Sequence, residues 1–132
     1  MGCLVKKDSI KFYSLFHEDP VVWVGVTQQI SFADELKKDS TASDYFPATY
    51  KEFYRSFYKS NIEEKFFNVQ ISSDGYIAAV IFDYSFWFNN KKINRGKESW
   101  GLIKTKGQWK ITSVLFSIEY EAINPSPIKI IK

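Results

Sequence analysis

The chain has 132 residues and a formal charge of +3, from 18 Lys and Arg against 15 Asp and Glu, so its length suits a single domain with one core. A single Cys and a single His exclude an internal disulfide framework and the ligand sets of zinc fingers. No apolar run reaches the roughly 18 residues of a membrane span, and the lysines are dispersed, so neither a membrane nor a nucleic acid is expected as a partner.

The first 60 residues predict two helices around one strand. Asp8 and Ser9 are N-cap residue types, and apolar side chains follow at helical spacing until Pro20 ends the helix. The β-branched run at 21–26 predicts a buried strand, and residues 27–46 are mixed, with a polar stretch that reads as an exposed loop. A second helix is expected to begin near 43–47 and to end near Ser60, with one aromatic face formed by Tyr50, Phe53, Tyr54 and Phe57.

From Ile62 onward the pattern changes to four long strands joined by tight turns. Turns are expected at 73–75, at Asn89-Asn90 and at Lys106-Gly107, because Gly and Asn tolerate positive φ. Strands of this length must twist and curl, and Gly96 and Gly101 are natural positions for bulges. We therefore predict an α+β fold: a curved antiparallel meander that wraps around the N-terminal helices and forms a cone.

Side-chain alternation divides the sheet into two faces. Pairing the strands across the expected turns places the carboxylates of Asp83 and Glu98 together, on a face that also carries three tryptophans. A bulge at Gly96 would exchange part of this assignment. The opposite face is strongly apolar, and we expect it to form a homodimer interface; it carries Phe82, Tyr84, Phe86, Val114, Phe116 and Ile118.

Asp83 and Glu98 are the predicted catalytic residues. In a closed cone, desolvation and mutual repulsion would raise their pKa values, so that one carboxyl serves as general acid or base. The alternative is that either carboxylate pairs with Arg95 or a lysine, or lies at the rim in water. His17 is a weaker catalytic candidate, because at a helix end it can simply interact with the last carbonyls.

The chain contains no motif that is typical of other catalytic classes. It has no GxSxG nucleophile motif, no Gly-rich phosphate loop and no close pair of metal ligands, so we expect neither a cofactor nor a metal. A small apolar or aromatic ligand is the expected partner. The side chains predicted to contact it are Trp23, Tyr54, Trp87, Trp100, Trp109 and Ser113.

The segment VIFDYSFWFNNKKINRGKESWGLIKTKGQWKITSVLFS resembles the C-terminal sheet of the nuclear transport factor 2-like superfamily, which includes SnoaL-like domains. LFHEDPVVWVGV resembles the second helix and first strand of the same fold. The resemblance runs from about Asp8 to Tyr120 of one domain spanning 1–132, with 1–7 and 124–132 expected to be flexible. Because few residues precede Asp8, the usual long first helix is expected to be missing.

The resemblance implies a scaffold with several uses, since its members include ketosteroid isomerases, scytalone dehydratases, polyketide cyclases, epoxide hydrolases, transport adaptors and association domains. Two functions stay open: a cofactor-independent isomerase, cyclase or dehydratase that uses an inward carboxylate, and a non-catalytic ligand-binding or association module. The default compartment is the cytoplasm, with export possible if an N-terminal segment precedes this sequence.

Overall fold

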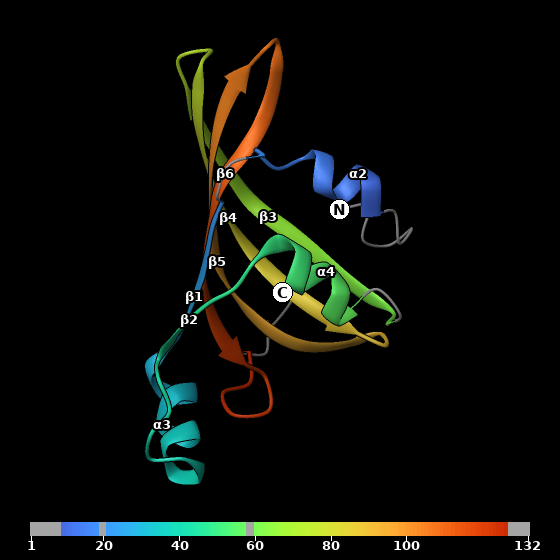
Figure 1. Ribbon diagram of the computed structural model, residues 1–132. Coiled ribbons are helices and arrows are strands. Elements are labelled where there is room, and N and C mark those ends of the chain that lie inside the picture. Colours follow the sequence, from blue (N-terminus) through green and yellow to red (C-terminus); the bar gives the residue numbers. More distant parts are fainter. Residues whose placement is uncertain (1–8, 19–20, 58–59, 127–132) are drawn as a thin grey trace, which may run out of the picture.

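The computed structural model describes residues 9–18, 21–57 and 60–126, which form three helices and six strands (Figure 1). This arrangement confirms the predicted α+β class. The expectations for residues 1–7, including the missing first helix, and for 127–132 lie outside the described residues. The helices are α2 (Ser9–Ser14), α3 (Gln29–Lys38) and α4 (Tyr50–Phe57). The strands are β1 (Val22–Thr27), β2 (Tyr45–Pro47), β3 (Ile62–Ser73), β4 (Ile77–Phe88), β5 (Lys91–Thr105) and β6 (Gln108–Tyr120).

Strands β3 to β6 form the predicted antiparallel meander. The two tightest turns lie where the sequence placed them, and both have positive φ at their central residues: 49° and 64° at Asn89 and Asn90, and 51° and 76° at Lys106 and Gly107. These angles suit a two-residue hairpin whose twist matches that of the strands. The β3–β4 turn uses Gly75 at φ 94°, as predicted.

The sheet is mixed, because β1 joins it in parallel beside β6. Trp23 lies opposite Val114, and β2 then pairs antiparallel with β1, so the strand order is β2-β1-β6-β5-β4-β3. The strand predicted at 21–26 is therefore correct. Its parallel pairing brings the N-terminal third of the chain against the last strand.

Two β-bulges set which side chains face inward. Between β4 and β5, Trp87 pairs with Lys92 but Phe86 pairs with Asn94, so Ile93 is an extra residue. Between β5 and β6, Leu102 pairs with Ile111 but Gly101 pairs with Ser113, so the extra residue is Thr112. A slip of one residue turns every following side chain to the other face of its partner strand.

The two bulges turn Glu98 and Trp100 of β5 onto the face that carries Phe82 and Val114, and the predicted inner and outer faces of β4 and β6 are reversed. Phe82, Tyr84 and Val114, which we expected on an outer dimer surface, have 2%, 3% and 2% of their surface exposed. Phe116 is partly buried, and all four belong to or pack against the core that also contains Phe12 of α2 and Tyr54 of α4. This face is therefore the inner one and is unavailable to a second chain; the oligomeric state itself stays a prediction.

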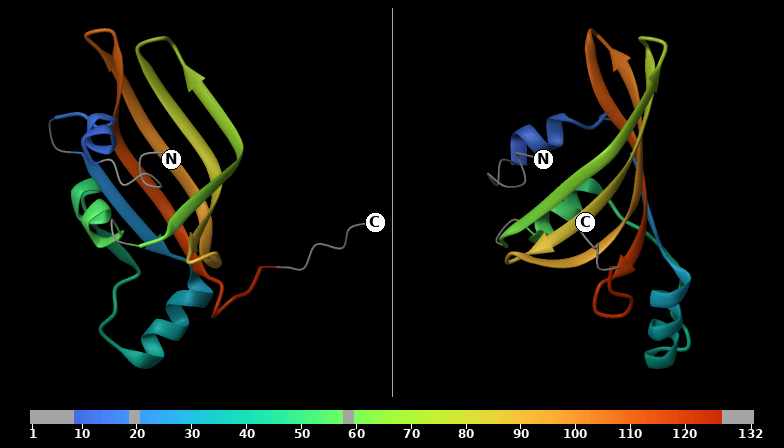
Figure 2. Two further views of the ribbon diagram at one scale, coloured as in Figure 1. Left: turned by 90° about the vertical axis from the view of Figure 1, so that its right-hand side faces the viewer. Right: turned by 180° about the vertical axis from the view of Figure 1, so that it is seen from behind.

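Helices α2 and α4 lie on the concave side of the curled sheet (Figures 1 and 2). Aromatic rings fill the space between helices and sheet: Phe16 stacks on Tyr50 with ring centroids 4.2 Å apart, and Trp23 lies 5.2 Å from Phe53. Such pairs add to the free energy gained by burying the rings. The aromatic face predicted for the second helix thus contributes to the core through Tyr50, Phe53 and Tyr54.

Helix α3 lies within the segment that the sequence left unassigned. Gln28 at its N-cap makes no side-chain capping bond. The acceptor comes instead from β6: the buried carboxylate of Glu119 accepts the Ser31 backbone N–H at 3.0 Å and also the Ser31 hydroxyl. The backbone N–H of Tyr120 donates to the Ser31 hydroxyl oxygen at 2.9 Å. These three hydrogen bonds fix α3 to the end of β6, next to Tyr120.

Beyond β6, Arg95 donates to the Asn124 carbonyl at 2.7 Å and Ser126 donates its backbone N–H to Glu121 at 2.8 Å, so this part of the predicted flexible tail is tied to the sheet. Among the helices of the described residues, none is long and apolar enough to cross a membrane.

Candidate functional site

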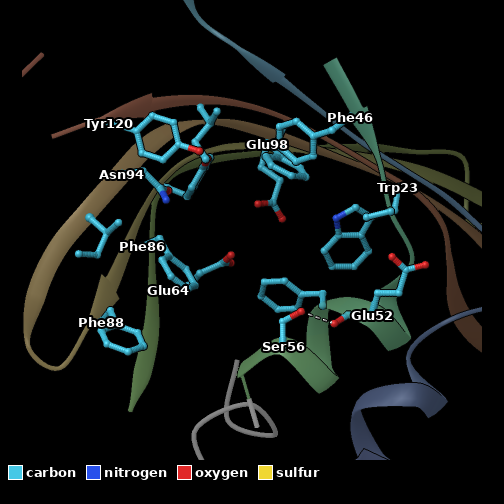
Figure 3. Close-up of a pocket in the computed structure, with 16 residues that line it drawn as sticks. Trp23, Phe46, Glu52, Ser56, Glu64, Phe86, Phe88, Asn94, Glu98 and Tyr120 are labelled. Atoms are coloured by element: carbon cyan, nitrogen blue, oxygen red, sulfur yellow. Dashed lines mark hydrogen bonds between the residues drawn. The ribbon is translucent and has the colours of Figure 1, made fainter. Parts of the chain in front are cut away.

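A cavity of about 580 Å³ lies between the concave face of the sheet and helix α4 (Figure 3). It exists because the sheet curls away from the helix, so that the aromatic side chains cover its walls without filling its centre. Most of the wall is apolar. The described lining residues are Trp23, Phe46, Ala48, Glu52, Phe53, Ser56, Glu64, Tyr84, Phe86, Phe88, Ile93, Asn94, Glu98, Phe116, Ile118 and Tyr120.

Glu98 is the most enclosed acidic group of this wall, with 6% of its surface exposed. It stands on β5 between Phe82 of β4 and Phe116 of β6, and its carboxylate points into the cavity (Figure 3). The indole N–H of Trp100 donates to Oε2 at 2.5 Å. Burial raises the pKa of Glu98 to about 7, although the bond from Trp100 acts in the opposite direction.

Glu64 supplies a second carboxylate from β3, and it also points into the cavity (Figure 3). It lies opposite Phe86 in the β3–β4 pairing, two alternations along the concave face of β4 from Phe82, which lies opposite Glu98. Burial raises the pKa of Glu64 well above its ordinary value, and the negative charge of Glu98 raises it further. When two carboxyls interact in an apolar cavity, the state in which only one of them is ionised is favoured over the state in which both are.

The remaining polar groups of the cavity come from three elements. Asn94, on β5, is 8% exposed and its side chain points into the cavity, where no described residue forms a hydrogen bond with its amide. Ser56 and Glu52 lie on α4, where the Ser56 hydroxyl donates to the Glu52 backbone carbonyl at 2.8 Å. Tyr84 is already engaged, because its hydroxyl donates to the Ser117 carbonyl at 2.7 Å.

Gly96 makes the Tyr84 bond possible. A Cβ at this position would lie 2.0 Å from the Ser117 carbonyl oxygen, far inside contact distance. The glycine thus lets the Ser117 carbonyl approach the concave side and accept the tyrosine hydroxyl. Along β5 it lies between Asn94 and Glu98, which both line the cavity.

Comparison with known proteins was made at three levels. No family model matches the sequence, and no curated protein matches it. Among solved structures, an NTF2-like (nuclear transport factor 2-like) protein of unknown function from Pseudomonas putida is 10% identical, with a TM-score of 0.64, over 99% of this chain and 87% of its own. A cystatin-like protein of unknown function from Nostoc punctiforme gives 13% identity and 0.61, over 89% and 81%. The fold is NTF2-like.

A candidate ketosteroid isomerase from Parabacteroides distasonis also has the NTF2-like fold, with 13% identity and a TM-score of 0.58 over 89% of this chain and 80% of its own. Identities this low establish the shared fold alone, so the chemistry has to be argued from the side chains in the cavity.

The predicted pair of Asp83 and Glu98 does not form in this NTF2-like sheet. Asp83 is on the convex face opposite Lys97, whose ammonium it accepts at 2.9 Å, and it also accepts the Asn68 amide at 2.9 Å. These bonds, that of Asn68 first, lower the pKa of Asp83. The bulge at Ile93 explains the error, because without it Glu98 would face the same side as Asp83. Asp83 thus matches the alternative of a surface ion pair.

Of the other predicted site residues, some lie at the cavity and the others lie elsewhere in the molecule. Trp23 lines the cavity, Trp100 binds Glu98 from beside it, and Tyr54 lies in the aromatic core 5.5 Å from Phe12. Trp87 faces away from the cavity. Its indole N–H donates to the Ser85 hydroxyl, and the Lys65 ammonium lies over its ring.

Three further predicted residues lie outside the cavity wall. Trp109 is 39% exposed near the β5–β6 hairpin. Ser113 pairs with Gly101, on the face opposite Val114. His17 donates its backbone N–H to Ile111 and lines a separate groove beside α2.

Glu64 is the residue that the sequence analysis missed. A strand was predicted over 63–72, but its faces were not assigned. Phe66 and Glu64 alternate on one face, and Phe66 packs 4.7 Å from Phe82. An alternation argument from Phe66 would have placed Glu64 inward. Among the described residues, no group of three His, Cys, Asp or Glu side chains is arranged to hold a metal ion.

Proposed function

We propose that the cavity binds a small, largely apolar molecule and that Glu64 and Glu98 catalyse a cofactor-independent proton transfer on it. The observation that carries this proposal is a pair of carboxyls, Glu64 and Glu98, that point into a largely apolar cavity and have raised pKa values. A pKa of about 7 for Glu98 suits a general acid or base at neutral pH. The candidate ketosteroid isomerase among the structural neighbours supports this class of chemistry.

The reaction follows from a single shared proton. The ionised carboxylate removes a proton from the carbon next to a carbonyl group, and the electron pair moves onto the carbonyl oxygen. The protonated carboxyl donates a hydrogen bond to that oxygen as its negative charge develops. The proton then returns from the first carboxyl to the same carbon, which gives exchange, or to the γ carbon of a β,γ-unsaturated ketone, which gives the conjugated isomer. Isomerisation, cyclisation and dehydration of carbonyl compounds all use this step.

The test is proton transfer on neutral cyclic ketones of increasing size. Deuterium exchange at the α carbon is followed by proton NMR in D₂O, and isomerisation of β,γ-unsaturated ketones, beginning with 3-cyclohexen-1-one, is followed by ultraviolet absorbance of the conjugated product. Glu64→Gln and Glu98→Gln are each expected to lower the rate by roughly 10²–10⁴. Asp83→Asn is the matched control, because it removes a carboxylate on the other face of the sheet, and its rate should equal that of the wild type.

Equal rates for the wild-type protein and the Glu64→Gln/Glu98→Gln double variant across all ketones would overturn the catalytic proposal. Ketone binding without turnover would then favour the alternative, a non-catalytic ligand-binding module.

A further inference from the structure

Charge is distributed unevenly around the cavity. Three of its lining residues, Glu52, Glu64 and Glu98, are acidic, and none of the described lining residues is Lys, Arg or His. The ion pairs formed by described residues involve Asp34, Asp83 and Glu121, and none reaches these three glutamates. Glu52 is exposed on α4, so the acidic groups within the cavity are Glu64 and Glu98, and they contrast with the formal charge of +3 of the whole chain.

Polar atoms in the cavity are left without partners of the complementary kind. Trp100 occupies Oε2 of Glu98, while Oε1 accepts no hydrogen bond from a described residue. Asn94 is more than nine-tenths buried, and its amide points into the same space without a partner among the described residues. The Asn94 side chain offers both an acceptor oxygen and an NH₂ donor, whereas an ionised carboxylate only accepts, so a ligand with N–H donors can satisfy the Asn94 oxygen and an ionised carboxylate.

The aromatic walls have the geometry that attracts a cation. Phe116 is met edge-on by three rings: Phe46 at 5.6 Å and 70°, and Trp23 and Tyr84 at 6.5 Å and 78° and 86°. Rings set at steep angles around one space present both faces and edges to it. A ring face attracts ammonium groups, and Trp attracts them most strongly.

We propose that the ligand of this cavity is an organic cation: an amine with an apolar body, whose ammonium group binds Glu98, Glu64 and Asn94 while its body packs against Trp23, Phe53 and Phe116. This inference rests only on the ligand-binding part of the proposed function, since an ammonium group bound to both carboxyls occupies the pair that the proton-transfer step would use. An ammonium group supplies both the missing donors and the missing positive charge. A neutral alcohol of the same shape supplies a single donor and no positive charge.

Isothermal titration calorimetry with 1-adamantylamine and 1-adamantanol tests the proposal on the full chain. The two probes share one rigid apolar cage, and the amine stays protonated between pH 5.5 and 8.5. At pH 8.5 the amine is expected to bind roughly tenfold more tightly than the alcohol or better. At pH 5.5 the preference should fall to within about threefold, because the carboxyls then hold protons that the ammonium has to displace.

Single-carboxylate variants locate the effect. Glu98→Gln should lower the preference for the amine at pH 8.5 by roughly tenfold and leave alcohol binding unchanged. Asp83→Asn, which removes one carboxylate from the convex face, should leave both affinities unchanged. Tryptophan fluorescence provides a second readout, since Trp23, one of the four tryptophans, lines the cavity.

Equal affinities for amine and alcohol at pH 8.5 would overturn the cation proposal and leave the proposed function standing. Turnover of neutral ketones without a preference for the amine would have the same consequence. An amine preference that survives Glu98→Gln but not Asp83→Asn would also overturn it, by placing the amine on the convex surface. Binding of neither probe would overturn it and would withdraw support from the cavity as a ligand site.

Discussion

Replacing Glu98 with Gln is expected to stabilise the protein above pH 7 and to change its stability little near pH 5. The side chain is enclosed among aromatic rings, so its ionised form is poorly solvated. Gln has the same shape and keeps an oxygen that accepts the indole N–H of Trp100. The substitution therefore removes the charge and leaves the packing in place.

The magnitude follows from the pKa of Glu98, which rises from an ordinary 4.5 to about 7. The folded state holds this proton more tightly than the unfolded state, so stability decreases as the pH rises from 4.5 to 7 and stays low above that. The full decrease is about 3 kcal/mol, of which about 2.5 kcal/mol falls between pH 5 and pH 8. The neutral amide also removes the charge that raises the pKa of Glu64, which acts in the same direction.

Urea unfolding at pH 5, 6, 7 and 8 measures this effect, with the free energy of unfolding extrapolated to water for each protein. The difference between Glu98→Gln and the wild type should grow by about 2.5 kcal/mol across this range. Asp83→Asn is the control. Because the pKa of Asp83 is lowered from 3.8 by Asn68 and Lys97, its contribution is already complete at pH 5 and should stay constant up to pH 8.

Parallel curves for Glu98→Gln and the wild type would refute the reasoning. They would mean that Glu98 ionises at an ordinary pH in a solvated environment, and the shared proton with Glu64 would have to be abandoned.

Three further predictions concern the surroundings of the cavity. Trp100→Phe removes the hydrogen bond that favours ionised Glu98, so the pKa of Glu98 should rise above about 7 in a ¹³C NMR titration; a fall would contradict the assigned role of the indole. Gly96→Ala should lower the free energy of unfolding by about 1–3 kcal/mol, because its methyl group meets the backbone carbonyl of Ser117. Gly101→Ala should cost less, because its nearest neighbour is the Ser113 hydroxyl, which can rotate away; an equal cost for both would count against the backbone clash. Finally, the expected homodimer should form through the convex face, where Ile77, Ile81 and Leu115 are 61%, 38% and 48% exposed. Light scattering at micromolar concentration should give a dimer that Leu115→Arg dissociates, and a monomeric wild type would refute it.

The long strands and their turns could be predicted because both have local causes. Alternation over 76–88 and paired positive-φ residues such as Asn89 and Asn90 act within a few residues of each other. Helix α3 was missed because its N-terminal acceptor, Glu119, comes from a distant strand and leaves no capping signal beside Ser31. A capping group that comes from a distant part of the chain leaves no pattern in the residues next to the helix.

The candidate site was only half predictable for a related reason. Glu98 was selected because it is a carboxylate on a face predicted to carry three tryptophans, and it does line the cavity. Its predicted partner was wrong because the sequence gives no sign of the extra residue at Ile93, where no glycine marks the bulge. Gly96, where a bulge was considered, instead serves the close approach of Ser117.

The parallel pairing of β1 with β6 has a consequence for how the cavity comes into being. Trp23 and Val114, which are paired across these strands, are separated by 91 positions in the chain. Contacts of such high sequence separation carry the largest loop-closure cost and tend to form late. During synthesis, the part of the cavity wall that contains Trp23 cannot pair with β6 until this strand has left the ribosome. The cavity is complete only when β6 has joined β1, so a molecule that binds it would stabilise only chains in which this pairing has formed.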